Sequence, residues 1–127
     1  MEYDENSISG FVLDACIKIH REFGPGLLER VYEDCLCFEL DAAGIPYERQ
    51  KPIPLQYNGH TIGDGFRADL VVADSVIIEL KSVSQLEPVH FSQLTTYLKL
   101  TGLKLGLLIN FNEQTLIKGF HRIANRL

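Results

Sequence analysis

The sequence has no apolar run that approaches the roughly 18 residues needed by a membrane-spanning helix. It also lacks a basic leader followed by an apolar stretch, so neither a membrane span nor a secretory signal is expected. Cysteine is scarce and odd in number, with Cys16, Cys35 and Cys37 all in segments of helical pattern. We interpret them as small buried residues of a protein in the reducing cytoplasm, and only secondarily as metal ligands.

Positive charge is also in short supply. The chain carries 12 lysines and arginines against 17 aspartates and glutamates, and this net charge of −5 argues against a general nucleic-acid-binding protein. The charge is unevenly distributed, because residues 1–80 hold 6 basic and 15 acidic residues whereas residues 81–127 hold 6 and 2. The C-terminal part therefore has the charge to meet phosphates, although scattered solvated side chains are the simpler interpretation for most of it.

No internal repeat or low-complexity segment interrupts the chain. Its 127 residues and hydrophobic content of 46% predict one globular domain over residues 1–127. The polar residues 1–6 are expected to form a frayed tail.

Two short apolar segments, residues 70–72 and 76–78, predict a pair of buried β-strands joined by a tight turn. If the turn is centred on Asp74, then Asp69 lies directly opposite Glu79. Directly opposed residues share one face of a sheet, so the two carboxylates are expected to be close neighbours.

Lys81 follows the second carboxylate by two residues and therefore points to the same face. Two carboxylates and an ammonium group are costly to bury on apolar strands, because like charges repel and each loses its solvation. A divalent cation that prefers oxygen ligands, Mg²⁺ or Mn²⁺, would remove that cost, and the lysine could then activate a water or offset phosphate charge. The alternative is that all three side chains are simply solvated at the strand ends.

The remaining pattern predicts helices and strands on both sides of this pair. The expected helices cover residues 7–23 (with Ser7 as the N-cap), 26–43 and 87–101, and the other strands cover residues 45–57, 60–66, 103–111 and 116–123. Prolines at positions 52 and 54 favour an edge position for the first strand. Asn58-Gly59 predicts a two-residue hairpin, and Gly63-Asp64-Gly65 predicts a bulge in the returning strand. The strand after the last helix is expected to be parallel to its central partner.

Three signatures of this sequence resemble those of the PD-(D/E)XK nuclease superfamily, and they follow one another along the chain in the order typical of the family. The first is the aspartate followed by Glu79-Leu80-Lys81 on the next strand, although Ala68 stands where many members have proline. The second, Gln93-Leu94-Thr95-Thr96-Tyr97, matches the Gln-x-x-x-Tyr element of RecB-like exonucleases. The third lies upstream, where Gly26-Leu27-Leu28-Glu29-Arg30-Val31-Tyr32 matches the signature of the GxxExxY proteins, small members of the same superfamily.

The resemblance implies an α/β fold with a restriction-endonuclease-like core, a mixed β-sheet flanked by helices. It also implies hydrolysis of nucleic-acid phosphodiester bonds with Mg²⁺ or Mn²⁺. The implied metal ligands are Glu29, Asp69, Glu79 and the backbone carbonyl of Leu80. The implied catalytic residues are Asp69, Glu79, Lys81 and Gln93. The candidates for positioning substrate are Tyr97, Tyr32, Arg67 and His90.

The substrate-positioning candidates rest on placement as well as on resemblance. His90, Gln93 and Tyr97 share one helix face, from which Tyr97 could donate to a phosphate or stack on a base. Arg67 precedes Asp69 by two residues and could meet a phosphate. Each has a plainer alternative: a polar helix stripe for the first three and a surface side chain for the arginine.

Alternatives also remain for the upstream signature and for the function. Glu29 could simply favour the helix dipole, and Tyr32 could be a packing residue. The chain could also be a catalytically silent nuclease-fold domain that binds nucleic acid or protein as a regulatory subunit. The expected partner is nucleic acid, DNA ahead of RNA, and a protein partner or a homodimer stays open.

Overall fold

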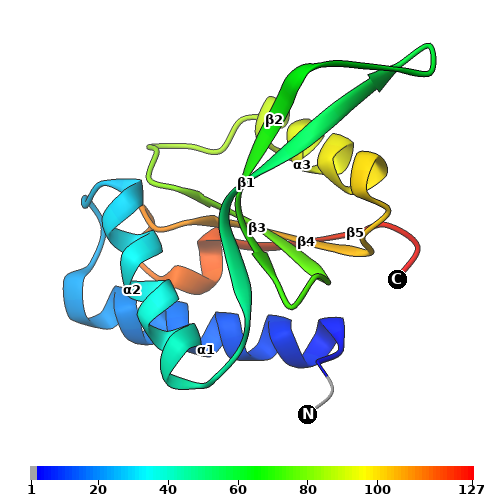
Figure 1. The fold of residues 1–127 in the computed structure, drawn as a ribbon. Coiled ribbons are helices and arrows are strands. Elements are labelled where there is room, and N and C mark those ends of the chain that lie inside the picture. The colour runs from blue at the N-terminus through cyan, green and yellow to red at the C-terminus, as the bar shows by residue number, and fades with distance from the viewer. Residues whose placement is uncertain (1–2) are drawn as a thin grey trace.

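A five-stranded mixed sheet lies between helices on both of its faces (Figure 1). The computed structural model describes residues 3–127. Its elements are α1 (Glu5–Phe23), α2 (Glu29–Ala42), β1 (Tyr47–Tyr57), β2 (His60–Val72), β3 (Val76–Lys81), α3 (Pro88–Thr101), β4 (Leu105–Asn110), the 3₁₀ turn η1 (Leu116–Gly119) and β5 (Phe120–Ala124). The strand order is β1-β2-β3-β4-β5, and every neighbouring pair is antiparallel except β3–β4, which α3 connects. The predicted α/β class, a mixed sheet flanked by helices, is confirmed.

Apolar side chains fill both sides of the sheet. On one side, α1 and α2 pack on a cluster that includes Leu70, Ile78 and Leu107. On the other side, α3 packs on a smaller cluster that includes Ile77 and Leu108. Residues Val76 to Leu80 of β3 are all buried, as expected of a central strand covered by helices on both faces. No helix of the described residues is both long enough and apolar enough to cross a membrane.

The first helix begins earlier than predicted. Asp4, rather than Ser7, is the N-cap, because its Oδ1 accepts a hydrogen bond from the Ser7 backbone N–H at 2.7 Å. The prediction of a frayed tail is therefore wrong for Glu5 and Asn6, which lie in α1. The tail prediction for residues 1–2 falls outside the described residues.

The β1–β2 hairpin follows the predicted pattern and extends beyond the rest of the sheet (Figure 1). Asn58 and Gly59 form the turn with positive φ values of 53° and 75°. The strand register shifts between Ile53 and Leu55, opposite residues 63–65, as expected for the bulge. The proline-containing strand β1 lies at the edge of the sheet, which is also confirmed.

Residues 116–123 are not one strand as predicted. Leu116–Gly119 form a single 3₁₀ turn, in which Leu116 is buried among the side chains beneath α1, and only then does β5 begin. The Lys118 N–H donates to the Thr115 carbonyl, a local hydrogen bond that a strand would not make. The strand prediction failed because a short apolar run does not distinguish these two conformations.

Candidate functional site

Strands β2 and β3 separate at Asp69 and Glu79. Their register pairs Leu70 with Ile78, and continuing it by one residue sets Asp69 opposite Glu79. The ladder stops there, and the side chains complete the hydrogen bonding. Asp69 Oδ2 accepts from the Leu80 N–H at 2.9 Å, and Glu79 Oε2 accepts from the Asp69 N–H at 2.7 Å. The two carboxylates are therefore fixed side by side by reciprocal bonds to each other's strand.

Burial dominates the electrostatics of this pair. It raises the pKa of Glu79, which is 5% exposed, and the neighbouring charge of Asp69 raises it further, to about 8. Burial also raises the pKa of Asp69, while the Leu80 N–H, the Gln50 amide and the Lys81 charge act in the opposite direction. The pair therefore favours holding a proton, or another cation, between strands that offer little solvent.

Lys81 and Glu29 supply the remaining charges near the pair. The Lys81 charge lowers the pKa of both carboxyl groups, and the charge of Glu29 raises the pKa of both. Glu29 is the first residue of α2 and is exposed. Glu29, Asp69, Glu79 and Lys81, four of the charged residues that the sequence predicted for the site, therefore influence one another electrostatically.

A cavity of about 430 Å³ lies beside Asp69, between the first residues of α2 and the first part of β1. Its lining consists of Glu29, Arg30, Glu33, Arg49, Gln50 and Asp69. Glu79 and Lys81 do not line this cavity. The cavity gives a ligand access to Asp69 from the α2 side.

Three residues of this region were missed by the sequence analysis: Glu33, Arg49 and Gln50. Glu33 is buried, and its Oε2 accepts from Arg49 Nε at 2.9 Å while its Oε1 accepts from Gln50 Nε2 at 2.9 Å. The same Gln50 amide reaches Asp69 Oδ1 at 3.3 Å. Glu33 offered one sequence signal, since it follows Glu29 by one helical turn.

Tyr32 does not position substrate. Its ring is fully buried and stacks on Phe111, with the ring centres 4.1 Å apart. Its hydroxyl donates to the Gly24 carbonyl at 2.6 Å and accepts from the Leu27 N–H at 3.1 Å. The hydroxyl of Tyr32 therefore stabilises the turn that precedes α2. Helix α2 itself begins at Glu29 rather than at residue 26 or 27 as predicted.

Tyr97 is near the carboxylates but is 3% exposed. Its pKa is raised to about 12 by burial and then by the charges of Glu79 and Asp69, and its ring packs against Phe66. The expectation that Tyr97 stacks on a base is wrong, because so little of the ring is exposed. Gln93, one turn earlier on α3, is half-buried.

The other two substrate-positioning candidates have partners within the protein. His90 Nδ1 accepts from the Glu87 N–H at 2.9 Å and closes a capping box at the start of α3. Arg67 Nη1 donates to the Gln50 carbonyl at 3.1 Å. The arginine thus touches the carboxylate network through Gln50, whereas the histidine serves the helix end.

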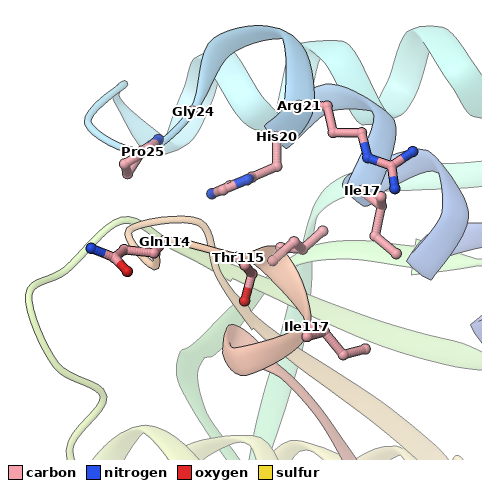
Figure 2. Close-up of a pocket in the computed structure, with 9 residues that line it drawn as sticks. Ile17, His20, Arg21, Gly24, Pro25, Gln114, Thr115 and Ile117 are labelled. Carbon is pink, nitrogen blue, oxygen red and sulfur yellow. The ribbon is translucent and has the colours of Figure 1, made fainter.

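A second cavity of about 430 Å³ lies between the end of α1 and η1 (Figure 2). His20 points towards the turn at Gly24 and Pro25, whereas Arg21 points away from it (Figure 2). His20 Nε2 already lies 2.7 Å from the Glu113 carbonyl. None of the predicted site residues lines this cavity, so it is not the candidate site.

The residues of the carboxylate pair suit a hard divalent cation. They offer oxygen donors, and a cation between them would offset the repulsion and desolvation that raise both pKa values. Within residues 3–127, no three histidine, cysteine, aspartate or glutamate side chains converge on one point, so protein carboxylates alone do not complete a coordination shell. A Mg²⁺ ion commonly keeps several waters in such a site.

The family comparison agrees with this geometry. Residues 6–123 match the PD-(D/E)XK nuclease superfamily, a span that includes Glu29, Asp69, Glu79 and Lys81. Comparisons with curated proteins and with solved structures gave no significant match. The chain therefore belongs to the PD-(D/E)XK nuclease superfamily.

Proposed function

We propose that this protein hydrolyses phosphodiester bonds of nucleic acid with the help of Mg²⁺ or Mn²⁺. The observation that supports this most is the buried Asp69–Glu79 pair, because reciprocal backbone bonds fix two carboxylates that repel each other. A pair with only a structural role would be more stable if an uncharged side chain replaced one of the two carboxyl groups. A role in binding a cation explains why both carboxyl groups are present.

Within this proposal, Asp69 and Glu79 are the principal ligands, and the Leu80 carbonyl is a third donor. Glu29 does not form one ligand cluster with the two carboxylates and contributes its charge near the site. The bound ion would stabilise the negative charge that develops on the phosphate. Lys81 orients or activates the attacking water and offsets charge on the phosphate. Gln93 bonds to that water or to a phosphate oxygen.

Substrate contacts follow from the same geometry. Arg67 lies beside Asp69 and is exposed, so it can meet a phosphate while holding the Gln50 carbonyl. The buried Tyr97 contributes through its hydroxyl rather than its ring. The expected substrate is DNA ahead of RNA.

We also infer that the chain belongs to the GxxExxY group of the superfamily. Gly26, Glu29 and Tyr32 carry that signature, and they have separable roles here. Gly26 adopts a φ of 103° in the turn, Tyr32 holds the turn, and Glu29 then begins α2 beside the carboxylates.

The direct test is cleavage of end-labelled single- and double-stranded DNA and RNA in Mn²⁺ or in EDTA. We expect wild type to cut in Mn²⁺ only, and Lys81→Ala to be inactive while it remains folded. Cleavage that continues in EDTA, or at the wild-type rate in Lys81→Ala, would contradict the proposal.

A second candidate is a nuclease-fold domain that binds a nucleic-acid or protein partner without cutting. The net charge of −5 favours a protein partner over nucleic acid for such a domain. A homodimer would be one such partner. Thermal melting with and without Mn²⁺ separates the two candidates, because a ligand at 100 times its Kd stabilises the folded state by about 2.7 kcal/mol. A shift in Tm that Asp69→Ala removes favours the enzyme, and no shift in wild type favours the binding domain.

A further inference from the structure

One residue of β1 has a backbone conformation that does not belong in a strand. Gln50 has a φ of 49°, in the left-handed region that residues with a side chain rarely adopt. The other described non-glycine residues with positive φ are Asn58, Ala73, Asp74 and Arg126, which lie in turns or near the C-terminus. Gln50 alone among them lies inside a strand with paired residues on either side.

The unusual conformation falls at the candidate site. The β1–β2 ladder pairs Arg49 with Leu70 and Lys51 with Ala68, and it skips the position between them, where Gln50 faces Asp69. The alternation of β2 also breaks there. Ala68 packs in the cluster beneath α3, whereas Leu70 packs in the cluster beneath α1 and α2.

The side chain of Gln50 is held as firmly as its backbone. Its Nε2 bridges Glu33 Oε1 at 2.9 Å and Asp69 Oδ1 at 3.3 Å, and its carbonyl accepts from Arg67. Glu33 itself is 6% exposed and is paired with Arg49 at 2.8 Å. The amide therefore connects Asp69 to an anchored ion pair on the neighbouring helix.

The two oxygens of Asp69 are thus fixed by different partners. Oδ2 bonds to the backbone of β3, and Oδ1 is directed towards the cavity and α2 by the Gln50 amide. Strained conformations that persist in folded proteins cluster at functional sites, where the geometry is part of the mechanism. Hydrogen bonds from outside the coordination shell likewise orient metal ligands.

We propose that Gln50 is a positioning residue that holds Asp69 in the orientation required to bind the divalent cation, and that its strained backbone is retained for this purpose. The inference rests on the proposed function, because it assigns the bound cation to Asp69. It adds Gln50 to the site, with the Glu33–Arg49 pair as the anchor of the Gln50 amide.

Two substitutions separate positioning from stability. Gln50→Ala removes the amide but keeps the backbone strain, whereas Gln50→Gly removes the amide and adopts positive φ freely. We expect the Tm of Gln50→Gly without metal to exceed that of Gln50→Ala. Both should nevertheless bind Mn²⁺ with a Kd roughly 10–100 times that of wild type.

The measurements are Mn²⁺ titration by calorimetry and melting in EDTA, on the full chain. Gln56→Ala is the matched control, because Gln56 lies on the same strand, is exposed and, within residues 3–127, makes its one side-chain hydrogen bond to Thr61. It should bind Mn²⁺ as wild type does.

Each outcome decides one point. If Gln50→Gly binds Mn²⁺ as tightly as wild type, the positioning role is overturned while the proposed function stands. If wild type binds no Mn²⁺, the proposed function is overturned together with this role. A Tm of Gln50→Ala equal to or above that of Gln50→Gly would overturn the claim that the backbone is strained.

Discussion

Replacing Glu79 by glutamine is expected to stabilise the metal-free protein at neutral pH. Burial and the charge of Asp69 raise the pKa of Glu79 in the folded state, to about 8, above its ordinary value of 4.5. The stability contributed by the protonated Glu79 carboxyl is therefore complete below its pKa in the unfolded chain. It is lost as the pH rises from that value through the pKa of the folded protein. Glutamine has no such dependence, and its amide oxygen can still accept from the Asp69 N–H.

The size of the effect follows from the pH interval. Between pH 5 and pH 7 the folded state keeps the proton while the unfolded chain has released it, so wild type loses about 3 kcal/mol relative to Glu79→Gln. For a chain of this length, 1 kcal/mol corresponds to roughly 3–5 °C in Tm. The difference in Tm between the variant and wild type should therefore grow by roughly 10 °C over this interval.

The assay is thermal melting in EDTA at pH 5, 6, 7 and 8. Glu48→Gln is the control, since Glu48 is an exposed carboxylate that pairs with Lys51 on β1. A difference in Tm between Glu79→Gln and wild type that does not change with pH would refute the assignment of the raised pKa to Glu79.

Three further substitutions test separate parts of the structure. Lys81→Ala should lower the cleavage rate by about 10²–10⁴-fold, as expected for loss of a group that activates the attacking water. The calorimetric Kd for Mn²⁺ should stay within about threefold of the wild-type value. An equally large loss of Mn²⁺ binding would show that Lys81 helps to form the metal site instead. Tyr32→Phe should reduce the free energy of unfolding in urea by about 1–3 kcal/mol, because the Gly24 carbonyl and the Leu27 N–H lose their partner, and an unchanged midpoint would show that the turn does not need it. Gly65→Ala should lower the free energy of unfolding by more than about 1 kcal/mol in the same assay, because the added Cβ would meet the Ile53 carbonyl. Gly63→Ala, also at positive φ but in open space, should lower the free energy of unfolding by less. Equal decreases for the two variants would disprove the clash.

The central part of the site could be predicted from the sequence because its geometry is local. A three-residue turn centred on Asp74 fixes the register of β2 and β3, and the register fixes the meeting of Asp69 and Glu79. The boundaries of α3 were equally local, with Pro88 in its first turn and Gly102 in the left-handed conformation at its end.

The partnership of Gln50 with Asp69 could not be predicted, because it depends on a bulge between these residues and the hairpin turn. Counting back from the Asn58-Gly59 turn sets Asp69 opposite Glu48, whereas the register after the bulge sets it opposite Gln50. The sequence marks the bulge by its glycines but does not state how many residues it absorbs.

The role of Tyr32 could not be predicted for a different reason. A tyrosine one turn after Glu29 is compatible both with a site and with a core, and only the tertiary structure shows its hydroxyl bonded to Gly24 and Leu27. The N-cap of α1 was missed because Asp4 and Ser7 are both good N-cap residues, three positions apart.

The central claim is that the Asp69–Glu79 pair serves a cation and catalysis at the expense of stability. The measurement that tests it most directly is Mn²⁺-dependent cleavage of labelled DNA by wild type and by Glu79→Gln at pH 7. We predict that wild type cuts and that Glu79→Gln, although the more stable protein, does not. Cleavage by Glu79→Gln at the wild-type rate would contradict the claim.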